Sequence, residues 1–210
     1  MSDSNITKKA LADAMKELMQ EKKFEKISVT DICDRCGMNR KSFYYHFRDK
    51  YDLVNWIFYI GFIENFDMAT YEKYPDEEGE LKNPEIDTWK LASDMCNYFY
   101  RERAFYKKAL MIEGQNSFKD YFHDAIFPMV QLFLSDILVD DYGDFFVTSL
   151  CDMIISMLVR WITSPNTEPP ESLMLSLSEM VIRLSKRIVE EDEKNRNSPN
   201  YPLKHLLKTQ

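Results

Sequence analysis

Apolar residues recur every three to four positions along most of the chain, which is the spacing of amphipathic helices. Within residues 6–20, Leu11, Ala14, Met15 and Leu18 follow the i, i+3, i+4, i+7 pattern, with Lys and Glu between them. This segment is therefore predicted to be a helix that buries one face.

Two short helices and one longer apolar helix are predicted next. Ser28 can cap the first of them while Asp31 returns a bond to the cap, and Gly37 can end it in the left-handed conformation. The second short helix is expected at about 39–47. The longer helix, at about 51–66, is apolar on most sides and is predicted to join the N-terminal module to the rest of the chain.

The same periodicity predicts five more helices, near 85–102, 104–113, 117–139, 143–163 and 171–191. A loop is expected at 75–84, and residues from about 195 lack periodicity. Pro128 lies inside the third of these helices and is expected to kink or split it.

Composition and charge limit the class of protein. Only 5 Gly in 210 residues suits a helical protein better than a turn-rich β protein. The net charge of −8 is uneven, because residues 1–55 carry 11 Lys and Arg against 9 Asp and Glu, a net of +2, and the remainder carries −10. A slightly basic module on an acidic body can bind phosphates without binding polyanions indiscriminately.

Four cysteines are too few and too scattered for a disulfide framework, and no signal peptide opens the chain. The most apolar stretch, Met153–Ile162, is shorter than a membrane span and contains Arg160. A soluble, cytoplasmic protein that does not enter a membrane is expected.

The helix predicted at 39–47 has two chemically different faces. On a wheel of about 100° per residue, Phe43 and Phe47 fall together and are expected to face the core. The opposite side and its borders carry Arg40, Lys41, Ser42, Tyr44, Tyr45 and His46. Cations, a hydroxyl and two phenols suit phosphate oxygens and base edges. Two short helices separated by a Gly-containing turn form a helix-turn-helix, whose second helix enters the major groove.

The segment SVTDICDRCGMNRKSFYYHFRDKYDLV, residues 28–54, resembles the DNA-binding signature of TetR-family regulators. The resemblance covers about residues 8–54. It implies a helical homodimer whose C-terminal domain often binds a small effector. It also implies that Tyr44, Tyr45 and Lys50 contact phosphates or bases, and that the two Phe residues pack. The C-terminal part is similar in general appearance to a branch that includes activators of dihydroxyacetone kinase operons.

The predicted fold is all-α, with a three-helix helix-turn-helix domain at 1–50, a larger helical effector-binding and dimerisation domain at 51–194, and a tail at 195–210. The predicted DNA-binding residues are Ser28, Thr30, Asn39, Arg40, Lys41, Ser42, Tyr44, Tyr45, His46 and Lys50. Ser28, Thr30 and Lys50 lie at predicted helix starts, where free backbone N–H groups also favour the binding of phosphate. Asn39 departs from the Ser or Thr usual in the resembled family, and this bears on its groove contacts.

Two features of this segment have simple explanations. Cys33 and Cys36 form a CxxC, but no second pair completes a zinc site and no strand–helix context supports a redox motif, so both are predicted to pack behind the turn in place of the commoner alanines. His46 has no nearby acid or second His for catalysis, so it is expected to pack or to neighbour a phosphate. No cofactor, metal or enzymatic activity is expected.

Aromatic and Met residues between 85 and 135 are predicted to be core, unless a subset lines an effector pocket with a polar anchor. The candidate pocket residues are Trp89, Tyr98, Phe99, Arg101, Met111, Tyr121, Phe122 and His123. The last two long helices hold more apolar surface than a helical hairpin can bury, so a two-fold dimer interface is expected there, with intrachain burial as the alternative. The candidate interface residues are Phe146, Leu150, Ile154, Met157, Trp161, Leu177, Val181, Leu184 and Ile188.

These observations predict a regulator that binds a palindromic operator in double-stranded DNA as a homodimer, with repression as the commoner outcome in the resembled family. Its affinity for DNA would be modulated through the C-terminal domain by a small-molecule effector. The alternative is an activator or co-regulator that is signalled by a protein partner. An open pocket with a buried polar group in the C-terminal domain would favour regulation by a small molecule. A fully packed C-terminal domain would favour regulation by a protein partner. An enzyme would need a nucleophile–base pair, a metal cluster or a phosphate loop, and the sequence offers none of these.

Overall fold

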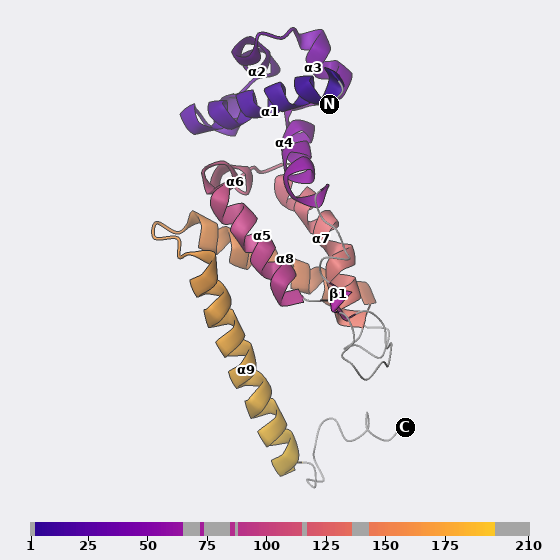
Figure 1. The fold of residues 1–210 in the computed structure, drawn as a ribbon, viewed down its shortest axis with the longest axis vertical. Coiled ribbons are helices and arrows are strands. Elements are labelled where there is room, and N and C mark those ends of the chain that lie inside the picture. The colour runs from indigo at the N-terminus through magenta and orange to yellow at the C-terminus, as the bar shows by residue number, and fades with distance from the viewer. Residues whose placement is uncertain are drawn as a thin grey trace. The chain divides into compact units, whose positions relative to one another are not determined.

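The computed structural model describes residues 3–64, 72–73, 85–86, 88–114, 117–135 and 143–195. These residues are almost entirely helical, which confirms the predicted all-α class (Figure 1). The exceptions are two short strands, β1 (Glu72–Lys73) and β2 (Glu85–Ile86), which pair antiparallel. The loop predicted at 75–84 and the predicted tail beyond Asn195 lie outside the described residues.

The chain forms two compact units, Met1–Thr167 and Glu168–Gln210. The second contains one long helix, α9 (Pro170–Asn195). Leu175, Met180 and Ile182 of this helix are exposed apolar side chains. The domain boundaries expected from the sequence, near residues 50 and 194, stay predictions.

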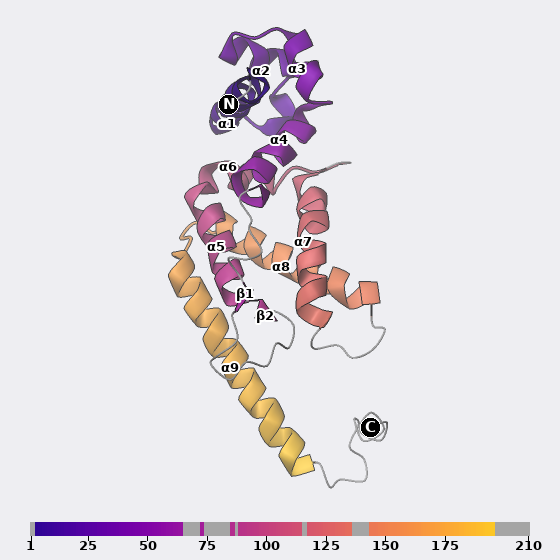
Figure 2. The same ribbon diagram turned by 45° about the vertical axis from the view of Figure 1, so that its right-hand side comes forward.

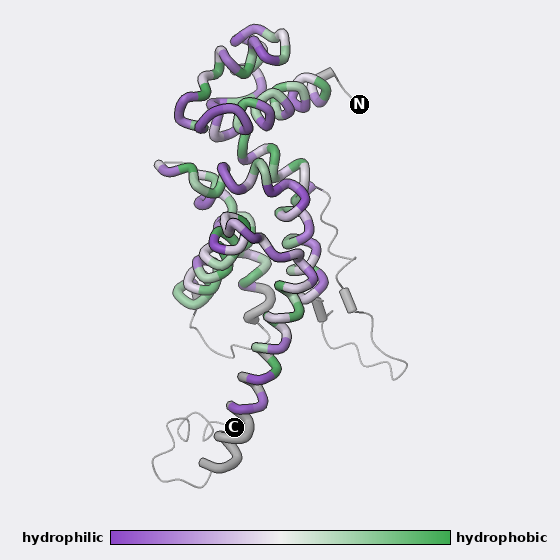
Figure 3. The backbone as a smooth tube through the Cα atoms, turned by 90° about the vertical axis from the view of Figure 1, so that its left-hand side faces the viewer, coloured by the Kyte–Doolittle hydropathy of each residue, from purple (hydrophilic) through white to green (hydrophobic). Residues whose placement is uncertain are grey.

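Three helices and a short turn form the N-terminal group, called here the head (residues 3–47). They are α1 (Asp3–Glu21), η1 (Phe24–Lys26), α2 (Val29–Cys36) and α3 (Arg40–His46), and α1 packs against both α2 and α3. Hydrophilic and hydrophobic segments alternate along these helices, as amphipathic packing requires (Figure 3). The apolar stripe predicted for α1 is buried, and it includes Leu11, Ala14, Met15 and Leu18.

The caps of α2 agree with the sequence. The Asp31 backbone N–H donates to Ser28 Oγ at 3.1 Å, and the Ser28 N–H donates to Asp31 Oδ2 at 2.7 Å, which completes a capping box. Gly37 has φ +68°, and the Met38 and Gly37 N–H groups donate to the carbonyls of Cys33 and Asp34. This is the bonding of a Schellman motif, which needs a residue that tolerates positive φ and so accounts for the glycine.

The remaining helices of the first unit form the body (residues 50–163). α4 (Lys50–Phe58) leads from the head into the body and continues as a π-helical turn, η2 (Tyr59–Ile63) (Figures 1 and 2). The helix was predicted to reach about residue 66. Its regular α-helical part instead ends at Phe58, because the next turn is wound with i→i+5 bonds such as Glu64 N–H to Tyr59 O.

α5 (Thr88–Arg101), α6 (Arg103–Ala109), α7 (Phe118–Ser135) and α8 (Gly143–Thr163) complete the body, close to their predicted bounds. Pro128 was predicted to kink or split this helix. α7 continues through Pro128 as one helix, so the helix is not split there, and a kink stays a prediction. Proline removes one backbone hydrogen bond from a helix, and the packing of α7 along α8 and against α4 holds the remaining turns together.

The centre of the body is filled with aromatic rings around Phe58, which has no exposed surface. Its ring centroid lies between 5.3 and 6.3 Å from those of Phe62, Tyr98, Phe99, Tyr106, Phe118, Tyr121 and Phe122. The hydroxyls of Tyr98 and Tyr106 lie 2.7 Å apart inside this cluster. Burial raises the pKa of Tyr98 to about 12 and that of Tyr106 well above its ordinary value, so both phenols stay neutral.

Polar contacts outside α4 also join the head to the body. Lys16 on α1 pairs with Glu102, the residue between α5 and α6, at 2.8 Å. Lys108 on α6 donates to the carbonyls of Met19 and Gln20 at the end of α1. A cation is favourable at this position because the last turn of a helix presents unpaired carbonyls and the negative end of the helix dipole.

Asp144–Thr163 in α8 is long and apolar enough to cross a membrane by length and composition alone, with a mean hydropathy of 1.7. One third of it is buried within the protein. A core helix of a soluble protein has the same properties, so this single helix is weak evidence for a membrane span. The apolar segment is nevertheless longer than the ten residues singled out in the sequence.

Candidate nucleic-acid interface

α3 is fixed to the head by its inner face. Phe43 is fully buried and Phe47 nearly so, as the helical wheel predicted, and their ring centroids lie 5.8 Å apart. Phe47 also meets the Trp56 ring of α4 at 5.7 Å. Asn39 caps the helix by accepting the Ser42 N–H at 2.8 Å. The side-chain oxygen of Asn39 is therefore occupied within the chain.

The outer face of α3 exposes two tyrosines and two cations. Tyr45 is 83% exposed and Tyr44 is 50% exposed, although large aromatic residues usually bury most of their surface. Lys41 and Arg40 are exposed beside them, and the Arg40 guanidinium lies 5.8 Å from the Tyr44 ring centroid. This face, Arg40–Lys41–Tyr44–Tyr45, is called the reading face below.

His46 borders the reading face. Its ring meets the Tyr45 ring edge-on at 4.9 Å. Burial, and then the nearby positive charge of Lys8, lower the pKa of His46, so the imidazole is neutral near pH 7.

Lys50, which was predicted to contact a phosphate, is engaged within the chain, and its contact with DNA stays a prediction. Its ammonium donates to the carbonyls of Phe24 at 2.8 Å, Ile27 at 2.9 Å and, more weakly, Glu25 at 3.4 Å, and it lies 4.3 Å from the Phe24 ring centroid. These bonds occupy the three donors of a lysine. Lys50 therefore ties α4 to the end of η1, and burial lowers its pKa.

The other helix-start residues keep an open side. Thr30 is exposed, and Ser28 is exposed although its hydroxyl also donates to Asp31 Oδ2 at 2.7 Å. The hydrogen bonds to Ser28 hold the pKa of Asp31 well below its ordinary value. The carboxylate that completes the cap is therefore ionised at neutral pH.

Cys33 is buried and Cys36 is half-buried, and both are free thiols. Burial raises the pKa of each, which keeps the thiols neutral and poorly nucleophilic. Cys36 Sγ donates to the Ile32 carbonyl at 3.3 Å. In the part of the chain that the structure describes, no cluster of three or more His, Cys, Asp or Glu could hold a metal ion.

The residues predicted to line an effector pocket have different surroundings in the structure. Phe99 and Phe122 belong to the aromatic core, whereas Trp89 and Met111 are exposed. Tyr98 and Arg101 border a crevice between head and body, and His123 borders a separate groove. Tyr121 packs against Phe58. Helical spacing groups residues by face but does not distinguish an aromatic core from a lined cavity, which is why the predicted set includes residues of both kinds. An effector pocket in this part of the chain stays a prediction.

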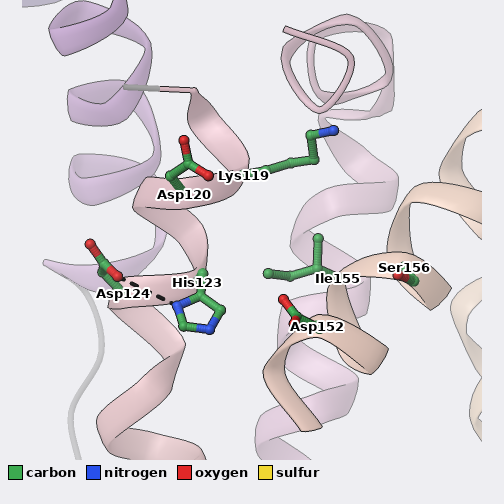
Figure 4. Close-up of a pocket in the computed structure, with 7 residues that line it drawn as sticks. All are labelled: Lys119, Asp120, His123, Asp124, Asp152, Ile155 and Ser156. Atoms are coloured by element: carbon green, nitrogen blue, oxygen red, sulfur yellow. Dashed lines mark hydrogen bonds and ion pairs between the residues drawn. The ribbon is translucent and has the colours of Figure 1, made fainter. Parts of the chain in front are cut away.

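The groove at His123 lies between α7 and α8 and has a volume of about 610 Å³. Figure 4 shows Lys119 and His123 projecting from α7, opposite Asp152 and Ile155 of α8. His123 Nδ1 lies 3.4 Å from Asp124 Oδ1. The remaining lining residues are Asp120 and Ser156, so the groove is mainly polar and acidic.

α8 carries an exposed apolar stripe, defined by Phe146, Leu150, Met153 and Met157. Phe146 is 45% and Met153 is 60% exposed, and Leu150 is half-buried. Phe145, beside the stripe, is also exposed. Phe145 and Met153 were missing from the predicted interface, although their spacing along α8 could have identified them.

One predicted interface residue is core. Trp161 is 8% exposed and stacks on Tyr100 of α5 with ring centroids 6.0 Å apart. Ile154 and Leu177 are half-buried. The side chains of Val181, Leu184 and Ile188 lie outside the described residues.

The head is thus a helix-turn-helix DNA-binding module, with a capped first helix, a left-handed glycine turn and a second helix that presents an aromatic and basic face. Two family descriptions match the chain: "Bacterial regulatory proteins, tetR family" over residues 11–57, and "Transcriptional regulator C-terminal region" over residues 87–200, which is more than half of the chain. The chain belongs to the TetR family of transcriptional regulators.

The individual proteins that this chain resembles include one named as an activator and one named as a repressor. The HTH-type dhaKLM operon transcriptional activator DhaS of Lactococcus lactis subsp. lactis (strain IL1403) is 31% identical over 125 residues, which cover 58% of this chain and 57% of that protein. The match thus spans less than two thirds of the relative. A solved structure of the dihydroxyacetone kinase operon activator DhaS aligns with TM-score 0.57 and 23% identity, over 86% of this chain and 97% of that one.

The solved structure of NalD, the secondary repressor of the MexAB-OprM multidrug efflux pump in Pseudomonas aeruginosa, aligns over the same shares of the two chains. Its TM-score is 0.56 and its sequence identity is 17%. At these identities the two structural matches establish a shared fold.

Proposed function

We propose that two copies of this chain bind a palindromic operator in double-stranded DNA, each placing α3 in a major groove, and thereby regulate transcription. The observation that carries the proposal is the reading face, where two phenols and two cations are exposed on a helix whose opposite side is locked into the core. Asn39, Ser42 and His46 lie on α3 or at its start, and Ser28 and Thr30 lie at the start of α2. All five are proposed as further phosphate or base contacts.

Repression is proposed as the default outcome, because a dimer on its operator blocks access to an overlapping promoter. Activation is the second candidate, since the 31% identical relative carries the name of an activator. The reading face serves either outcome, because the sign of regulation depends on where the operator lies relative to the promoter.

The described interior of the body is packed with aromatic rings, which does not support an effector held at its centre. We propose that the regulatory signal acts at the outer surfaces of the body, carried either by a small molecule or by a protein partner. The contacts of Lys16 with Glu102 and of Lys108 with the end of α1 support transmission to the head.

The salt dependence of DNA binding tests the proposed interface. Phosphate contacts from two heads release condensed counterions, so affinity is expected to fall by about 10³-fold between roughly 50 and 200 mM salt if six phosphates are contacted. Fluorescence anisotropy of labelled duplex at several salt concentrations measures the slope. A salt-independent affinity would contradict binding through the reading face.

Lowering the pH is expected to strengthen DNA binding through His46. The lowered pKa leaves the ring neutral in the free protein, and nearby phosphates favour the imidazolium, so the complex takes up a proton. The affinity therefore rises as pH falls from 7.5 to 5.5, by at most about tenfold per unit for one proton. Comparison with His46→Gln isolates the effect, and an unchanged pH dependence in this variant would exclude His46.

Met153→Glu is expected to disrupt the homodimer and with it tight operator binding. Met153 lies in the middle of the exposed stripe of α8, and a carboxylate there would be desolvated in an apolar interface. Light scattering coupled to gel filtration measures the mass. Met111→Glu is the matched control, because Met111 is 55% exposed and lies outside α8. A dimeric Met153→Glu protein would place the interface elsewhere.

A further inference from the structure

A crevice of about 270 Å³ opens where α1 of the head meets the body. Residues of α1, α4 and α5 line this crevice. α1 provides Lys16, α4 provides Trp56 and Ile57, and the end of α5 provides Tyr98 and Arg101. The crevice adjoins the packed aromatic centre through Tyr98 and shares no lining residue with the groove between α7 and α8.

The inner wall of the crevice is apolar and firmly held. Ile57 and Tyr98 are nearly buried, and the Tyr98 hydroxyl is engaged by Tyr106 at 2.7 Å. A Cβ added at Gly61 would lie 2.2 Å from Tyr98 Oη, so any side chain at position 61 would collide with this wall. Gly61 belongs to the π-helical turn η2, and such turns occur often at functional sites.

The rim of the crevice is charged. Lys9, Lys16 and Arg101 face Asp13 and Glu102, which leaves one positive charge in excess. Lys16 and Glu102 pair at 2.8 Å, and each side chain is about a third exposed, 30% and 32%. The Arg101 guanidinium lies 5.8 Å from the Tyr98 ring centroid. Two cations from different helices, Lys16 and Arg101, thus flank an apolar wall, and Glu102 already supplies a carboxylate to one of them.

We propose that this crevice binds a small aromatic carboxylate. The ring lies against Trp56 and Ile57, and the carboxylate takes hydrogen bonds from Lys16 and Arg101, displacing Glu102 from Lys16. The volume is just below the roughly 300 Å³ at which pockets for drug-sized ligands begin, which suits a molecule with one ring. Inorganic phosphate would leave the apolar wall uncovered, and a neutral ring would bring no anion to Arg101 and would leave Lys16 paired with Glu102.

A ligand in this position touches the head through α1 and the body through α4 and α5. It also replaces the Lys16–Glu102 pair, which is one of the contacts that hold α1 to the body, and leaves the hydrogen bonds of Lys108 to the end of α1. Binding is therefore coupled to the orientation of the head, and the coupling is reciprocal between ligand and DNA. This consequence for DNA rests on the proposed function, whereas the ligand site itself does not.

Isothermal titration of the full chain with benzoate, benzyl alcohol and inorganic phosphate, all without DNA, tests the site. Benzoate is expected to saturate one site per chain, with the other two probes at least about tenfold weaker. Lys16→Met and Arg101→Met are each expected to weaken benzoate binding by about tenfold. Lys119→Met, in the groove between α7 and α8, is the matched control and is expected to bind as wild type does.

Glu102→Gln gives the sharpest result, because it removes the competing carboxylate and keeps the shape of the side chain. This variant is expected to bind benzoate several-fold more tightly, which a misfolded protein cannot imitate. Absence of saturable benzoate binding, insensitivity to Lys16→Met and Arg101→Met, or weaker binding by Glu102→Gln would each overturn the proposal. Since no titration contains DNA, any of these failures leaves the proposed DNA-binding function untouched.

Discussion

Lys41→Ala and Tyr45→Ala are each expected to weaken operator binding by roughly ten- to a hundredfold, without unfolding the protein. Both side chains project from the outer face of α3, and Tyr45 has 83% of its surface exposed. Their removal costs little stability, because substitutions at exposed positions usually change it by less than about 0.5 kcal/mol. A side chain that contacts a base or phosphate instead contributes about 1–3 kcal/mol to binding. Anisotropy titrations of a selected duplex, with thermal melts alongside, separate the two quantities.

The two variants are also expected to differ from each other. Lys41→Ala removes a charge and should flatten the salt dependence if Lys41 contacts phosphate, whereas Tyr45→Phe isolates the contribution of the phenol hydroxyl. Lys119→Ala on α7 removes the same charge far from α3 in the sequence and serves as the control. Wild-type affinity in both Lys41→Ala and Tyr45→Ala would mean that another face of the head contacts DNA.

Phe58→Ala is expected to destabilise the protein by about 3–5 kcal/mol, the usual cost of removing a large buried ring. Phe58 is fully buried and contacts rings from α5, α6 and α7, so its loss leaves a cavity that no single neighbour can fill. Urea denaturation followed by circular dichroism measures the change in the free energy of unfolding. Protein concentration must be held fixed, because a dimer's stability depends on it.

Tyr59→Ala provides the comparison for Phe58→Ala, since Tyr59 is the next residue and is 42% exposed. Its expected effect is below about 1 kcal/mol. Equal losses from the two variants would show that the helix itself, rather than the aromatic cluster, determines the effect. A loss below about 1 kcal/mol for Phe58→Ala would contradict the packed centre.

Short-range signals made the head predictable. The cap at Ser28, the glycine at 37 and the two faces of the helix at 39–47 depend on residues within about one helical turn of each other, and all three appear in the structure. The family resemblance rests on this same segment. The burial of Phe43 and Phe47 follows from helical periodicity alone.

Contacts between residues distant in the sequence were not predictable in this way. Lys50 was predicted to contact phosphate, and nothing in the sequence near it reveals that the carbonyls of Phe24, Glu25 and Ile27 lie within its reach. The pairing of Lys16 with Glu102 spans 86 positions, and no periodicity encodes it. Trp161 fits an apolar stripe equally well whether that stripe packs against Tyr100 or against a second chain. In each case the partner is chosen by the tertiary arrangement of the helices.

Selection of bound duplexes from a randomised DNA pool by the purified protein, followed by sequencing, tests directly whether the chain recognises a palindromic DNA sequence. For a homodimer that reads DNA with two copies of α3, we expect enrichment of one palindromic site whose half-sites are centred about one helical turn, or a multiple of it, apart. We also expect the Lys41→Ala variant to lose or alter the enriched sequence. A well-folded, dimeric wild-type protein that enriches no sequence at moderate salt, with and without benzoate, would contradict the claim.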